Sequence, residues 1–118
     1  AGIFAKLGHT DQIVIADCGL PIPHGVTCID LAYELGKPSF KEVLAAVLAD
    51  VAVESSVCAQ EITCHNADLW QHLEALSLNT SQISHEAFKQ QTAQAKVIIR
   101  TGEATPYANV ILQSGVIF

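Results

Sequence analysis

An amphipathic helical pattern, set among short β-branched runs, constrains the fold of this chain more than any other feature. Ser39 and Glu42 can form a capping box at the start of this helix. Gln12–Ala16 is a β-branched run that stops at Asp17, which predicts a strand that delivers a carboxylate at its end. The residues of the helical pattern, which recur at one buried face, are Phe40, Val43, Leu44, Val47, Leu48 and Val51.

Further strands and helices alternate along the rest of the chain. The expected strands cover 12–16, 26–30, 96–100 and 110–112, with a brief strand over 51–54 and added pairing over 116–118. After the capped helix, the expected helices cover about 55–65, 66–76 and about 85–94, the last with Ser84 as its N-cap. Two prolines force Leu20–Pro23 into an extended loop. This alternation predicts one α/β domain over residues 1–118, with a small central sheet flanked by helices in three layers.

Composition excludes several classes of function. The net charge is −6 with only six Lys and Arg among 118 residues, so there is no basic stripe for nucleic acid or for an anionic membrane surface. No apolar run approaches the length of a spanning helix. The four cysteines form no CxxC pair, which is typical of a reduced, cytoplasmic protein. Half of the residues are apolar, a surplus for so short a chain that favours a homo-oligomer.

Hydrogen-bonding side chains concentrate in four places. They are His9 in the segment 8–11, Asp17, His85, and the segment 105–109 with Tyr107 and Asn109. In open α/β sheets, ligands bind beyond the carboxyl ends of strands, where Asp17 and the loop 101–109 are expected. Tyr107 and Asn109 would project to one face of an extended strand. Structural interpretations also remain: His9 can be a bonded loop histidine, Asp17 a turn-former, His85 a solvated residue and Tyr107 a packing residue.

Other kinds of site are not supported by the spacing of the residues. His65 and His72 lie seven apart without a second matching pair, which argues against a structural metal. The glycines form no phosphate-binding loop, and no Ser or Cys nucleophile with an identifiable base is visible. Acid–base chemistry on a neutral, polyhydroxylated ligand fits this inventory best.

Four motifs in order resemble the D-ribose pyranases, small cytoplasmic sugar mutarotases related to the L-fucose mutarotases. The matching stretches are Gly8-His9-Thr10-Asp11, Asp17-x-Gly19-Leu20-Pro21-Ile22-Pro23, His85-Glu86-x-Phe88-Lys89-Gln90-x-Thr92 and Pro106-Tyr107-Ala108-Asn109. The likeness covers almost the whole chain, and the Gly-Leu-Pro-Ile-Pro loop is similar to the ribose branch. Cys18 and Cys28 depart from the pattern. The chain also starts without Met, so an N-terminal segment that family members carry is expected to be missing.

The resemblance implies that the chain interconverts the β-pyranose and β-furanose forms of D-ribose without metal or organic cofactor. It places the family's proton donor on His9 and its sugar-binding positions on Asp17, His85 and the run Tyr107, Ala108 and Asn109. Lys89 lies one turn beyond His85 and is expected to be an accessory residue. The resemblance also implies rings of subunits, typically a decamer of two stacked pentamers with sites at subunit boundaries.

Three other functions remain open at this point. An L-fucose-type mutarotase would invert only the anomeric centre of its sugar. A non-catalytic sugar-binding module would bind ribose without accelerating exchange. A scaffold whose polar residues are structural would bind no sugar.

Overall fold

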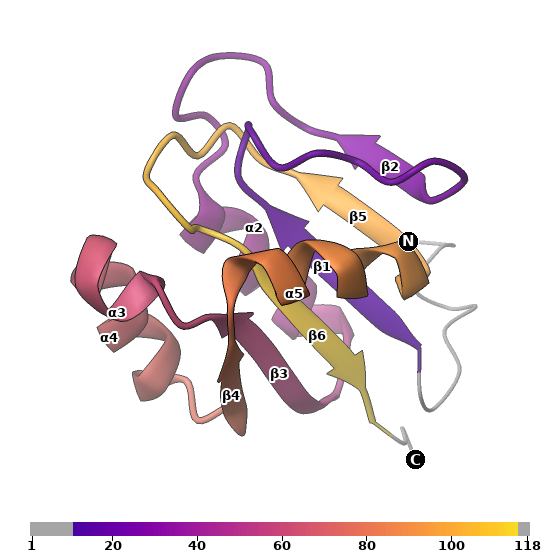
Figure 1. The fold of residues 1–118 in the computed structure, drawn as a ribbon. Coiled ribbons are helices and arrows are strands. Elements are labelled where there is room, and N and C mark those ends of the chain that lie inside the picture. Colours follow the sequence, from indigo (N-terminus) through magenta and orange to yellow (C-terminus); the bar gives the residue numbers. More distant parts are fainter. Residues whose placement is uncertain (1–10, 116–118) are drawn as a thin grey trace.

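A six-stranded sheet runs through the centre of the computed structural model, which describes residues 11–115 (Figure 1). The strands lie in the order β2-β5-β1-β6-β3-β4. Their bounds are β1 Gln12–Ala16, β2 Thr27–Asp30, β3 Val53–Ala59, β4 Thr80–Ile83, β5 Val97–Arg100 and β6 Val110–Ser114. The four strands predicted over 12–16, 26–30, 96–100 and 110–112 are confirmed, with small differences at their ends. The predicted pairing over 116–118 lies outside the described residues.

The strand directions bring five chain segments to one edge of the sheet. β1 pairs in parallel with β5, β5 with β2, and β3 with β4. β6 is antiparallel to both of its neighbours, β1 and β3. The carboxyl ends of β1 to β5 therefore point to the same edge, and β6 starts there. Loops that leave these strands can meet above this edge, as expected for the ligand-binding end of an α/β sheet.

Helices cover both faces of the sheet, which confirms the predicted three layers. Their bounds are α2 Phe40–Asp50, α3 Ile62–His65, α4 Ala67–Ala75, α5 His85–Gln91 and the 3₁₀ helix η1 Thr92–Gln94. In Figure 1, α5 crosses the near face of the sheet and α2 lies behind it. The predicted capping box of α2 is present: Ser39 Oγ accepts the Glu42 N–H at 3.2 Å, and Glu42 Oε1 accepts the Ser39 N–H at 3.2 Å.

Two hydrophobic cores lie on opposite faces of the sheet, because successive side chains of a strand alternate between faces. In β1, Ile13 and Ile15 pack into a core with α2, α3 and α4. Val14 and Ala16 pack into a second core with Phe88 of α5. β1 is thus a central strand buried on both sides, which explains its continuous apolar sequence.

The helix predicted over about 55–65 is wrong. The chain forms the strand β3 over Val53–Ala59 and turns into the short helix α3 only at Ile62. β3 lies between two other strands, and that tertiary pairing outweighs the weak local preference of its serines. Ser56 is buried and its Oγ lies 2.7 Å from Thr80 Oγ1 of β4, so a polar residue is accommodated inside the sheet.

β4, a strand at the sheet edge, was not predicted either. Its sequence is Thr80-Ser81-Gln82-Ile83, and no residue of it is fully buried. An edge strand has one free side and can be polar, so it leaves no apolar run in the sequence. The consequence for function is large, because β4 brings the start of α5 next to the end of β3.

The segment after β5 lies very close to the turn at residues 34–37. Gly102 O accepts the Gly36 N–H, and the Gly102 N–H donates to Pro38 O at 2.9 Å. A Cβ atom on Gly102 would overlap the backbone N and O of Lys37. Glycine is therefore required here by the close approach of two backbones.

We expect Gly102→Ala to lower the free energy of unfolding by about 1–3 kcal/mol, the usual cost of forcing extra volume into a packed site. The clashing atoms belong to a backbone that cannot rotate away. Urea unfolding of wild type and variant, at equal protein concentration, measures the change. Gly19→Ala is the matched control, because its Cβ would meet no atom closer than Asp17 Oδ1 at 3.9 Å. Equal losses in both variants would contradict the explanation.

Candidate functional site

A cavity with a volume of about 340 Å³ lies at the carboxyl edge of the sheet. Its volume is at the lower end of the range typical of small-molecule sites. The loop after β1, the start of α5 and the loop between β5 and β6 line it. The lining residues are Asp17, Cys18, Gly19, Leu20, Pro21, His85, Glu103, Ala104, Thr105, Pro106, Tyr107 and Asn109. The predicted meeting of Asp17 and the loop 101–109 at this edge is confirmed.

Asp17 and Asn109 form a fixed polar pair on one side of the cavity. Asn109 Oδ1 accepts the Asp17 N–H at 2.8 Å, and Asn109 Nδ2 donates to Asp17 Oδ2 at 3.3 Å. Asp17 Oδ1 accepts the Gly19 N–H at 3.0 Å. Asn109 is 1% exposed, so its amide orients the carboxylate from inside the fold. Asp17 and Asn109 lie 92 positions apart in the sequence, so no local pattern predicts that they form a pair.

Burial raises the pKa of the Asp17 carboxyl above its ordinary value. The N–H groups of Gly19 and Leu20, the amide of Asn109 and the charge of His85 act in the opposite direction, and together they are weaker. A carboxylate that is costly to keep charged gains more from a new hydrogen bond. A sugar hydroxyl that donates to Asp17 would supply such a bond.

His85 and Tyr107 line another part of the cavity, and their rings contact each other directly. Their rings meet edge to face with centroids 5.0 Å apart and an angle of 82° between planes. The Phe88 ring is nearly parallel to the His85 ring, with centroids 6.4 Å apart. His85 Nδ1 is buried and has no hydrogen-bond partner within residues 11–115. Buried polar atoms are nearly always paired, so Nδ1 keeps the capacity for a hydrogen bond that the described residues do not supply.

Tyr107 does not lie in an extended strand, and the prediction that it projects beside Asn109 from a strand is wrong. The strand β6 starts at Val110, and Tyr107 has a left-handed backbone with φ of 56°. The Asn109 N–H donates to Tyr107 O at 2.9 Å, which closes a tight turn. Such a conformation costs an aromatic residue about 1–3 kcal/mol and persists only where surrounding contacts impose it. Both residues nevertheless line the cavity.

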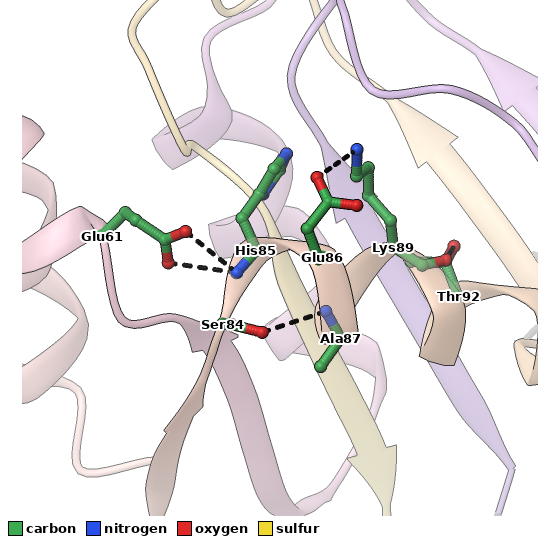
Figure 2. Close-up of polar contacts among 7 residues, drawn as sticks. All are labelled: Glu61, Ser84, His85, Glu86, Ala87, Lys89 and Thr92. Carbon is green, nitrogen blue, oxygen red and sulfur yellow. Dashed lines mark hydrogen bonds and ion pairs between the residues drawn. The ribbon is translucent and has the colours of Figure 1, made fainter.

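Two predicted site residues, Ala108 and Lys89, are not among those that line the cavity. His9 lies outside the described residues. The Ala108 side chain is fully buried in the core with α2, so only its backbone could meet a ligand. The half-buried Lys89 extends its Nζ to Glu86 Oε1 and forms an ion pair at 2.8 Å, as Figure 2 shows. That ion pair lowers the pKa of Glu86 below its ordinary value.

Three further residues organise the site, and the sequence analysis missed them. Both carboxylate oxygens of Glu61 accept the His85 N–H, at 3.0 and 3.1 Å (Figure 2). Glu103 Oε1 accepts the Phe40 N–H at 2.9 Å, and its Oε2 accepts the hydroxyl of Thr105 at 2.9 Å. Asn66 Nδ2 donates to Thr105 Oγ1 and Pro106 O. No local sequence motif marks these three residues. Glu61 was also hidden because it follows a strand that was predicted as a helix.

The described residues offer little for other chemistry. Within them, no group of three or more His, Cys, Asp or Glu side chains could hold a metal ion. No helix in the same part of the chain is long and apolar enough to cross a membrane. All four cysteines are free thiols, and burial raises the pKa of Cys58 to about 11, which makes it unreactive at neutral pH.

Comparison with known proteins identifies the family. The sequence pattern of the RbsD / FucU transport protein family matches residues 1–117. A D-ribose pyranase of Bacillus cytotoxicus is 58% identical and one of Exiguobacterium sp. is 57% identical, each over 100% of this chain and 92% of its own length. The structure of Bacillus subtilis RbsD complexed with D-ribose is 50% identical, with a TM-score of 0.96 over 99% of this chain and 91% of that chain.

A more distant likeness shows the same fold. The fucose mutarotase of Streptococcus pneumoniae, in complex with L-fucose, superimposes with a TM-score of 0.82 at 23% identity, over 99% of this chain and 91% of that chain. The match to the family pattern and the full-length relatives at 57–58% identity assign this sequence to a family. The chain belongs to the RbsD / FucU transport protein family.

Proposed function

We propose that this chain is an intramolecular isomerase that interconverts the β-pyranose and β-furanose forms of D-ribose. The observation that carries the proposal is the likeness, at half of all positions, to an RbsD structure that holds D-ribose. The full-length relatives named D-ribose pyranase support the same activity. The cavity supports it as well, because it is small and lined by groups that exchange hydrogen bonds with hydroxyls.

Ring opening and ring closure each need two proton transfers, and neither changes an oxidation state. A base removes the proton of the anomeric hydroxyl while an acid protonates the ring oxygen, which opens the pyranose to the aldehyde. The 4-hydroxyl then attacks the aldehyde carbon in place of the 5-hydroxyl, its proton leaves, and the carbonyl oxygen is protonated to give the furanose. Histidine suits these steps because its ordinary pKa lies near neutral pH.

In this proposal His9 is the primary acid and base, and His85 is its complementary partner. Asp17 orients the sugar, since it is held by Asn109 and directed to the cavity. His85 lines the cavity, and its buried Nδ1 atom has no hydrogen-bond partner within residues 11–115. The reaction then requires no metal and no organic cofactor.

The loop before β6 holds the hydroxyl groups of the sugar. Tyr107 contributes its phenol and Asn109 its amide, and Ala108 can contribute backbone groups alone. Lys89 acts as an accessory residue from the second turn of α5, where its Nζ forms an ion pair with Glu86. The sugar is held at its hydroxyls, so the open-chain intermediate can rotate about the bond that leads to its carbonyl carbon.

We further propose that the protein is a cytoplasmic homo-oligomer, a decamer of two pentameric rings, built from one mutarotase-like domain over residues 1–118. Exposed apolar side chains support an oligomer. Tyr33 and Leu35 are each 77% exposed and Leu31 is 43% exposed, all in the segment that follows β2. Three large apolar side chains so close together form a patch of the kind that marks an interface.

NMR saturation transfer on D-ribose tests the activity. Irradiation of the β-pyranose anomeric proton is expected to reduce the β-furanose signal in a protein-dependent manner. Protein-dependent transfer between the anomers of L-fucose, with none between the forms of D-ribose, would instead indicate an L-fucose-type mutarotase. Ribose binding with exchange equal to that of buffer would instead indicate a non-catalytic sugar-binding module.

A further inference from the structure

We propose that Glu61 and Asn66, at the two ends of α3, are positioning residues that set the contact between the His85 and Tyr107 rings. Neither residue lines the cavity, so neither can act by contact with the sugar. Each instead holds one wall of it. The inference rests on the proposed function for its kinetic test and stands on the structure for its geometry.

The Glu61 end of α3 holds the start of α5. β3 and β4 are parallel, with Ala59 opposite Ile83, so the chain leaves both strands side by side. Glu61 then accepts the His85 N–H with both carboxylate oxygens, at 3.0 and 3.1 Å. Figure 2 shows this carboxylate beside the first turn of α5, directed at the backbone nitrogen of His85. The bond fixes the residue whose imidazole reaches the cavity.

Glu61 is more than a second cap of α5. Ser84 Oγ already accepts the Ala87 N–H at 3.1 Å, and the Ser84 carbonyl accepts the Phe88 N–H at 2.8 Å. The first turn is therefore capped from within its own segment. The Glu61 bond adds a tie between α5 and a different segment, and His85 is the residue it ties.

The Asn66 end of α3 holds the loop before β6. Its side-chain amide donates to Thr105 Oγ1 at 3.0 Å and to Pro106 O at 2.9 Å. Pro106 immediately precedes Tyr107, whose left-handed backbone needs such a restraint. The His65 ring also contacts the Tyr107 ring, with centroids 5.5 Å apart. Asn66 and His65 together fix the second wall.

α3 itself is anchored, so the two ends cannot move independently. Ile62 is fully buried in the core with α2. The His65 N–H donates to Glu61 O at 3.0 Å, and the Asn66 N–H donates to Ile62 O at 2.9 Å. The separation of 5.0 Å between the His85 and Tyr107 rings thus depends on one short helix that bonds to both sides.

The test is a pair of truncations with conservative partners. Glu61→Ala and Asn66→Ala are each expected to lower kcat for ribose exchange about tenfold, because displacement of reacting groups by a fraction of an ångström slows reactions strongly. Glu61→Gln keeps an acceptor oxygen in the same place and is expected to stay within about twofold of wild type. Because both truncations loosen the same ring contact, the double variant is expected to lose less than the product of the single losses.

Matched controls separate positioning from general loss of stability. Glu74→Ala and Gln71→Ala remove a carboxylate and a carboxamide from exposed positions of α4. They are expected to leave kcat unchanged. All variants are assayed well below their melting temperatures, with folding checked by circular dichroism. Wild-type kcat and KM in both Glu61→Ala and Asn66→Ala, with only the melting temperature lowered, would overturn the proposal.

A second readout is independent of activity. Nuclear Overhauser contacts between the His85 and Tyr107 rings are expected in wild type and weakened in Glu61→Ala and Asn66→Ala. If the wild-type protein does not accelerate ribose exchange, the proposed function fails. The ring contacts in the two truncations would still test the positioning role. Ring contacts that persist in both truncations would refute the role even in an active enzyme.

Discussion

Replacing His9 with alanine is expected to slow protein-catalysed ribose exchange by about 10²–10⁴-fold, the range that one general acid–base group contributes. Ring opening requires an acid at the ring oxygen and a base at the anomeric hydroxyl within the same site. Asp17 Oδ2 accepts a hydrogen bond from the Asn109 amide, which places this carboxylate to orient the sugar. His85 can serve one of the two roles, so the loss of His9 leaves the other unfilled.

Ribose binding is expected to survive in the same variant, because the cavity keeps Asp17, Tyr107 and Asn109. Saturation transfer gives the exchange rate, and titration of the sugar followed by NMR gives the affinity. His24→Gln is the matched control, since His24 is exposed in the loop before β2 and does not line the cavity. Full exchange activity in His9→Ala would refute the assignment of the proton donor.

Local signals in the sequence predicted the parts of the fold that local physics decides. The capping box of Ser39 and Glu42 and the N-cap Ser84 need only neighbouring residues, and both are present. Asp17 was expected at the binding edge because a buried strand ends there and a proline-rich loop follows. These features survive in the folded chain because packing reinforces what the segments already prefer.

Features decided by distant contacts escaped prediction. β3 was mistaken for a helix because its strand character comes from pairing with β4 and β6, and the polar edge strand β4 has no apolar pattern of its own. The two errors together hid Glu61, whose partner His85 is bonded only because β3 and β4 lie side by side. The turn at Tyr107 was read as strand because nothing nearby in sequence reveals the restraint by Asn66.

Replacing Asp17 with asparagine is expected to lower kcat/KM for ribose about 10- to 100-fold, since a hydrogen bond to a charged group contributes about 1.5–3 kcal/mol. Asparagine has the same shape and can still accept the Gly19 N–H. It has no charge to offer a sugar hydroxyl, and its own NH₂ group would face the Asn109 amide nitrogen that now donates to Asp17. Asp50→Asn, at the exposed last position of α2, is the control and is expected to be fully active.

Stability is expected to change with pH in a direction that tests the cause of the raised pKa. Burial raises the pKa of Asp17 above its ordinary value of 3.8, so ionisation costs the folded state more than the unfolded chain. The contribution of Asp17 to stability is therefore complete below the unfolded pKa and declines as pH rises through the folded pKa. Asparagine does not titrate. The unfolding free energy of Asp17→Asn, relative to wild type, is expected to increase from pH 3.5 to pH 7 in urea titrations at fixed protein concentration. A relative stability that falls over this range would mean that the ionised carboxylate stabilises the fold. In that case the hydrogen bonds from Gly19 and Asn109 would outweigh burial, and Asp17 would be a structural residue first and a sugar ligand second.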